Sequence, residues 1–195
     1  QIFTDIKDID KDNLLLILSD AITIHEQNAR EIQFLMDYEK GVQPLKREKD
    51  VRPEIDIHAQ ENHAAEITEF KIGYEFGSPV TYVQRAKIDA RSIKYPESAS
   101  EEKDDIRISL LNEMMFEENK PAKDVKLARD FKICGVGYRM FRAKRHIDGV
   151  SVFDMAIPSP LTTFVVYSND AYREPVLGVT YSINTDGSRN YGAYT

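Results

Sequence analysis

A chain of 195 residues, 42% hydrophobic and 30% charged, is long enough to bury a core and has the composition of one globular domain, or at most two. Its longest apolar run, Leu14 to Leu18, is far shorter than the roughly 18 residues that span a bilayer, and the N-terminus lacks a signal-peptide pattern. The single cysteine, Cys134, excludes an intrachain disulfide and a cysteine-based zinc site. Because the chain starts at Gln1 and stops at Thr195 just as a strand pattern restarts, we expect a fragment of a longer protein.

The net charge of −7 is unevenly distributed. Residues 97–119 carry eight acidic and two basic side chains, a local charge of −6. Residues 120–146 carry nine basic and two acidic ones, a local charge of +7. Two adjacent blocks of opposite sign can serve DNA contact, subunit contact or solubility, and solubility is the default interpretation.

Helices and a linker are predicted over residues 1–57. The polar turn 10–13 precedes apolar residues and predicts one helix start, and a longer helix is predicted over roughly Ala21 to Glu39, with Gly41 as its stop. At about 100° per residue, the apolar arc of this helix contains Ala21, Ile24, His25, Ile32, Leu35 and Met36. Residues 41–57 hold two prolines and dense charge, which predicts an exposed connection.

Residues 58–137 are predicted to form helices with one short strand. The first helix, about His58 to Phe76, has two apolar faces, which is typical of a helix sandwiched between layers or between molecules. One face holds Ile67, Phe70 and Tyr74, and the nearly opposite face holds Ala65, Ile72 and Phe76. The turn 77–79 should end the helix, and Val80 to Val83 then predicts a strand.

Two further helices are predicted after a polar loop at residues 94–104. The first runs from about Asp105 to Glu118 and turns Leu111, Met114 and Met115 inward. The second starts at Pro121, which suits a first helical turn, and is closed by glycines 135 and 137. It places Leu127, Ala128, Phe131 and Cys134 on one arc and Lys123, Lys126, Arg129 and Lys132 on the other.

Beyond Gly137 the apolar period changes from 3.6 to about 2, which predicts antiparallel strands over residues 138–195. The expected strands cover 138–144, 150–157, 162–167 and 176–183, with hairpin signals at Asp148-Gly149 and Asp186-Gly187. Helices first and strands later predict an α+β fold, in which several N-terminal and central helices pack with a mainly antiparallel C-terminal sheet.

The histidines do not form a motif for catalysis or metal binding. His58 and His63, with Glu66 nearby, are five residues apart, so their side chains diverge by about 140° on a helix, whereas a zinc-binding pair needs a spacing of four. His25 lies on an apolar arc, where we expect a partly buried, hydrogen-bonded side chain and not a catalytic base.

Cys134 and the glycines that follow it are expected to be structural. The thiol lies at the C-terminal end of a helix, where the helix dipole disfavours a thiolate. Gly135 and Gly137 follow a helix and precede a strand, the reverse of a phosphate-binding loop. Nothing assembles a nucleophile, a base and an oxyanion donor, so no catalytic residue, cofactor or metal ligand is predicted.

The cationic face of Lys123, Lys126, Arg129 and Lys132 leaves three interpretations open. It can bind DNA phosphates, although no aromatic residue shares the face and the acidic block adjoins it. It can contact another subunit, with the acidic block 97–119 of one copy against the basic block 120–146 of the next. It can also be a solvated face.

Several segments, in this order, resemble tailed-phage portal proteins, the head–tail connectors. The resemblance rests on the helix 25–38 with Glu39-Lys-Gly41, on residues 62–80 with an aromatic-x-aromatic-Gly-x-Pro turn, on Ala128 to Tyr138, and on the segments 157–160, 166–167 and 176–181. The chain departs from the family pattern in the acidic insert around 97–105 and in length, because portal chains continue into stem, clip and crown. The whole chain, 1–195, would then be a portal wing.

The resemblance implies a non-enzymatic structural subunit of the virion, assembled in the host cytoplasm into a homo-oligomeric ring, usually a dodecamer, at one capsid vertex. Major capsid and scaffold proteins would surround the ring, terminase and head-completion proteins would bind parts absent from this chain, and DNA would pass through without sequence-specific contact. Two alternatives remain: a nucleic-acid-binding module using the basic face of residues 120–146, and a hydrolase using His58, His63 and Glu66.

Overall fold

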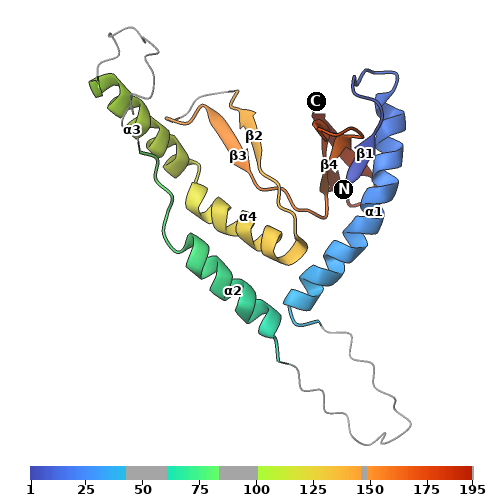
Figure 1. Cartoon of the computed structure of the whole chain (residues 1–195), viewed down its shortest axis with the longest axis horizontal. Coiled ribbons are helices and arrows are strands. Elements are labelled where there is room, and N and C mark those ends of the chain that lie inside the picture. Colours follow the sequence, from blue (N-terminus) through green and yellow to red (C-terminus); the bar gives the residue numbers. More distant parts are fainter. Residues whose placement is uncertain (43–60, 84–100, 146–148, 195) are drawn as a thin grey trace, which may run out of the picture.

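The structure, a computed structural model, describes residues 1–42, 61–83, 101–145 and 149–194, and only the backbone of 101–105 (Figure 1). The elements in chain order are β1 (Ile2–Thr4), α1 (Leu14–Glu39), α2 (His63–Phe76), α3 (Glu101–Glu117), α4 (Lys120–Cys134), β2 (Met140–Ala143), β3 (Phe153–Ala156), β4 (Thr163–Ser168), β5 (Pro175–Ile183) and β6 (Arg189–Tyr194). The predicted α+β class is confirmed. Among the described residues no helix is both long and apolar enough to cross a membrane.

One half of the molecule is a four-stranded sheet with α1 packed against it. The strand order is β1-β4-β5-β6, and every pair is antiparallel except β1 with β4, where Ile2 lies opposite Val166. The core between the sheet and α1 consists of Ile2, Ile17, Ala21, Phe164, Val166, Leu177 and Val179. Strand β1 was not predicted, because three residues are too few to display a period of two.

Helix α1 is one continuous helix, so the prediction of two N-terminal helices was wrong. The turn 10–13 does start it: the Asp10 Oδ1 accepts hydrogen bonds from the backbone N–H groups of Asp12 and Asn13, both at 2.9 Å. Within the predicted apolar arc, Ala21, His25 and Ile32 are buried. Ile24 and Leu35 remain exposed, because the sheet covers only part of the helix circumference.

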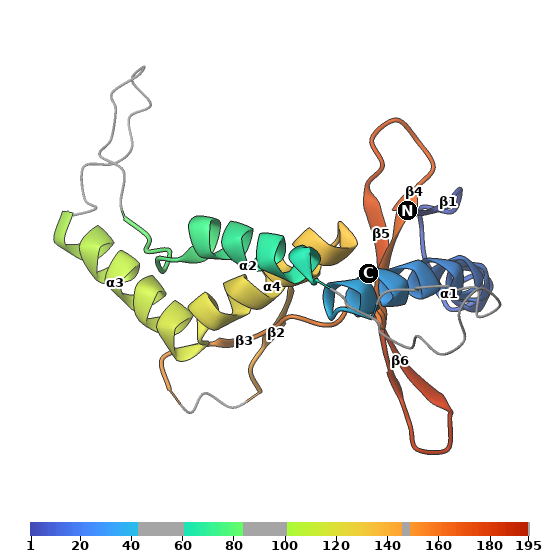
Figure 2. The same ribbon diagram turned by 90° about the horizontal axis from the view of Figure 1, so that it is seen from below.

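The other half contains α2, α3, α4 and a separate hairpin in which β2 pairs antiparallel with β3. Helix α4 lies between α2 and this hairpin, and α3 extends away from its N-terminal end (Figures 1 and 2). Pro121 falls in the first turn of α4 as predicted, and Gly135 ends the helix with a positive φ of 72°. The strands after Gly137 therefore belong to two sheets.

The segment after α2 differs from its prediction. Val80 to Val83 does not form a strand in the structure. Instead, the side-chain amide of Asn112 on α3 binds both backbone groups of Tyr82, accepting from its N–H at 2.8 Å and donating to its carbonyl at 2.9 Å. These contacts satisfy the polar groups that a neighbouring strand would otherwise satisfy.

The remaining predicted features are described only in part. The predicted connection 41–57 and loop 94–104 fall mostly outside the described residues, as does His58. Helix α2 is described from its N-cap, Asn62, whose side chain accepts a hydrogen bond from Ala65 N at 3.2 Å and donates one to the Glu39 carbonyl at 2.7 Å. That one asparagine joins the end of α1 to the start of α2.

Candidate functional site

The four cations of the α4 face are each engaged within the chain. Lys123 Nζ lies 3.0 Å from Glu118 Oε2, at the junction of α3 and α4. Lys126 Nζ donates to the Ile157 carbonyl at 2.7 Å and so ties α4 to the segment that follows the β2–β3 hairpin. These two lysines therefore connect neighbouring elements of the same subunit.

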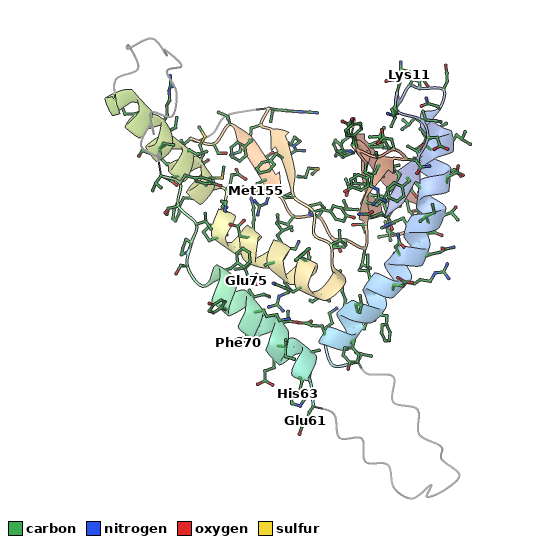
Figure 3. The ribbon with its side chains drawn as sticks, in the orientation of Figure 1. Lys11, Glu61, His63, Phe70, Glu75 and Met155 are labelled. Carbon is green, nitrogen blue, oxygen red and sulfur yellow. The ribbon has the colours of Figure 1, made fainter. Side chains whose placement is uncertain are left out.

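Arg129 and Lys132 connect α4 to the helices on its other side. Arg129 contacts Glu39 at 3.1 Å and also Glu69, and the hydrogen bond to Glu69 raises the pKa of the guanidinium. Lys132 Nζ lies 2.6 Å from Glu75 Oε1, on the side of α2 that faces α4 (Figure 3). DNA or another subunit would have to compete with these ion pairs to bind this face. The contact of the face with either partner stays a prediction.

The buried stripe of α4 begins with charged residues. Lys120 is 6% exposed and Asp124 is 5% exposed; they form an ion pair with each other, and Arg139 also contacts Asp124. Ala128 continues the stripe one turn later and is buried, but Phe131 of the predicted apolar arc is exposed. The apolar pattern misplaced this arc because charged residues, among them the paired Lys120 and Asp124, occupy most of the buried positions of α4.

A second buried acid, Glu118, joins three elements. It accepts hydrogen bonds from Met155 N at 2.8 Å, from Lys123, and from Lys144 at 3.2 Å. Burial alone would raise the pKa of Glu118, but these donors outweigh it and lower the pKa to about 2. The neighbouring Glu117 accepts from the N–H groups of Val150 and Ser151. Acids of the 97–119 block thus pair with bases of the 120–146 block inside one subunit.

His63 and Glu66 lie together but on the surface. His63 Nδ1 is 3.3 Å from Glu66 Oε2, and its Nε2 is 3.0 Å from Glu61 Oε2. His58, the third residue of the hydrolase hypothesis, lies outside the described residues. Among the described side chains no group of three or more metal-ligating residues comes together. Both hydrogen-bond partners of His63 in the described part of the chain are carboxylates, so its contacts there include no nucleophile.

His25 and Cys134 line the same cavity, of about 360 Å³, between α1, the end of α4 and β4. His25 is buried, donates from Nε2 to the Leu161 carbonyl at 3.1 Å and packs on Phe164; burial lowers its pKa. Burial, and then the Asp130 carboxylate, raise the pKa of Cys134 to about 11. A thiol that stays protonated and an imidazole already bonded to the backbone do not make a nucleophile and its base.

The sequence did not predict the ion pairs of α4. The Lys120–Asp124 pair could have been found, because residues at i and i+4 are neighbours on a helix. The pairs of Arg129 with Glu69 and of Lys132 with Glu75 join residues 60 and 57 positions apart, and no local pattern indicates them.

Helix α2 keeps one of its two predicted apolar faces uncovered by the described part of the subunit. Ile72 is buried on the side facing α4, whereas Ile67, Phe70 and Tyr74 are exposed, and Figure 3 shows Phe70 on the outer side of the helix. Within the described part of one chain, α2 is therefore packed on one of its two predicted apolar faces and not on the other.

Comparison with known proteins gives the family of this chain. A search of curated proteins gave no match to the chain. Residues 18–195 match the protein-family model described as phage portal protein, SPP1 Gp6-like. The match begins within α1 and includes both halves of the molecule, so the chain belongs to the phage portal protein family.

Proposed function

We propose that this chain is part of a structural ring subunit at the capsid vertex, which forms the conduit for DNA packaging and ejection and the head–tail junction. The family match over residues 18–195 carries this proposal. The proposed location is the virion, with assembly in the host cytoplasm. The proposed partners are other copies of the chain, in a ring of twelve, and the major capsid and scaffold proteins around it.

The electrostatics of the helical half support a conduit and not a DNA-gripping module. Protein–DNA affinity comes largely from cations that neutralise phosphates, and each of the four cations on the α4 face already has a partner within the chain. A subunit past which DNA slides in both directions should hold phosphates weakly. Terminase and head-completion proteins would bind regions of the subunit other than this chain.

Electron microscopy of the full natural gene product tests the proposal. We expect closed rings with a central hole, and a native mass that is a whole multiple of the subunit mass. A protein that remains a monomer at all concentrations, or that forms only open filaments, would overturn the proposal.

A binding assay addresses the nucleic-acid alternative. We expect this chain to bind a short DNA duplex weakly, with little change in affinity when Lys126 is replaced by Ala. Tight binding that falls steeply with salt, and that is lost in Lys126→Ala, would instead support a module using the basic face of residues 120–146.

A further inference from the structure

The outer face of α2 is a stripe of large apolar side chains without a described partner. Ile67 is 54% exposed, Phe70 is 75% exposed and Tyr74 is 85% exposed. Their spacing of three and then four residues places them on one side of the helix, about 160° to 220° around from buried Ile72. Anchors at i, i+3 and i+7 are the pattern by which a helix face docks into an apolar surface.

Helix α2 is held so that this stripe points outward. Its inner side packs on α4 through Thr68 and Ile72, both buried. The ion pairs of Glu69 and Glu75 with α4, and the Asn62 contact to the end of α1, fix the helix on the same side. Rotation of α2 to bury the stripe within the subunit would break all of these contacts.

A second exposed apolar patch lies at the C-terminal end of α1. Phe34 and Tyr38 are exposed there, and their rings pack on each other at 6.3 Å. Helices α1 and α2 form two different outer flanks of the molecule (Figure 1). A head-to-tail ring interface requires two different surfaces on one subunit, and the α2 stripe and this α1 patch are two different apolar surfaces.

We infer that the outer face of α2 packs against the exposed face of α1 on a second copy of the chain, an inference that rests on the proposed ring function. Two aromatic side chains and an isoleucine at these exposures present an apolar area on the order of 400 Å², at the size where exposed patches become functional. A standard interface buries about 800 Å² per partner, so the stripe supplies about half of one side. A polar rim would supply the rest.

Photo-crosslinking in the full natural gene product tests this contact. Tyr74 is replaced by p-benzoylphenylalanine, and Tyr172 is replaced in the same way as a control, because the two tyrosines are 85% and 83% exposed. We expect irradiated rings to give Tyr74-dependent dimers whose crosslinked peptides map to α1 of another copy, with none from position 172. Crosslinks to any other surface or protein, or no crosslinks, would overturn the inference.

Assembly measurements provide an independent test. We expect the double variant Phe70→Asp, Tyr74→Asp to raise the concentration for half-maximal ring assembly at least tenfold, with an unchanged circular dichroism spectrum, whereas Tyr172→Asp leaves it unchanged. Assembly should also persist in 1 M NaCl, because the contact is apolar; loss in salt would favour contact between the charged blocks instead. If the wild type forms no ring, the proposed function fails; if rings form normally in the double variant, only this inference fails.

Discussion

Different interactions dominate the interior of each half of this molecule. In the sheet half, α1 and the strands bury a continuous apolar core in which Val166, Leu177 and Val179 are almost completely inaccessible. In the helical half, several of the most buried side chains are charged, among them Glu118, Lys120 and Asp124. One half is stabilised by removing apolar surface from water, whereas in the other half matched charges hold neighbouring elements in position.

This difference determines what each half contributes. Apolar burial is non-directional and stabilises by roughly 25 cal/mol for each Å² removed from water. A buried ion pair adds little net stability, because desolvation offsets the attraction, but removing one partner is costly. The charge network therefore fixes the angle between α3, α4 and the β2–β3 hairpin more than it adds stability, which would suit the proposed ring subunit, whose outer faces would meet neighbours in a defined geometry.

Truncation of the sheet core should have the largest effect. Leu177 is 1% exposed, and we expect Leu177→Ala to lower the free energy of unfolding of the chain by about 3 kcal/mol, through lost burial and a residual cavity. Urea unfolding followed by circular dichroism measures this loss. The same substitution at Leu15, which is 73% exposed, is the matched control and should cost at most about 0.5 kcal/mol. Similar losses at both positions would contradict an apolar core here.

Neutralising Glu118 should have the next largest effect and should depend on pH. Glu118→Gln keeps the shape of the side chain but deprives Lys123 and Lys144 of their shared carboxylate, at a cost of about 2 kcal/mol at pH 7. Because folding lowers the pKa of Glu118 from 4.5 to about 2, the carboxylate stabilises the fold above pH 4.5, and this contribution is lost as the pH falls toward 2. The free energies of unfolding of Glu118→Gln and of the wild type, measured from unfolding curves at a series of pH values, should therefore converge as the pH approaches 2.

The control for this change lies on α3. Glu113 is exposed, so Glu113→Gln should leave the stability unchanged at every pH. If the free energies of unfolding of Glu118→Gln and the wild type differ by a constant amount down to pH 2, then the shape of the side chain, and not its charge, matters at this position.

The sheet half could be predicted from the sequence to a large extent. The alternation in residues 163–168 and 175–183, and the turn signal at Gly187, gave the strands within one or two residues, because their pattern reflects burial on one face. The pairing of β1 with β4 could not be predicted, since it joins Ile2 to Val166 across most of the chain. The pattern also did not reveal that β2 and β3 form a sheet of their own.

The sequence predicted the helices of the helical half but not the ion pairs that connect them. The sequence predicted the cationic residues of α4 but not their partners within the chain, because these lie on α1, on α2, at the end of α3 and after β3. Charged residues such as Asp124 count as surface positions in any apolar pattern, so a buried stripe that contains them is invisible to it. Only the three-dimensional contacts distinguish a paired charge from a solvated one.

Disrupting the ion pair between Lys132 on α4 and Glu75 on α2 should have the smallest effect. Lys132 and Glu75 form an ion pair whose side chains are partly exposed, so a double-mutant cycle with Lys132→Ala and Glu75→Ala should give a coupling of about 0.5 kcal/mol at low salt. This coupling should fall toward zero in 1 M NaCl, whereas the cost of Glu118→Gln should change little, because buried charges are screened less. A coupling as large and as salt-resistant as the Glu118 effect would mean that α2 is locked by the same kind of buried charge as α3 and α4, and the contrast between a weakly clamped outer helix and a rigid inner corner would no longer hold.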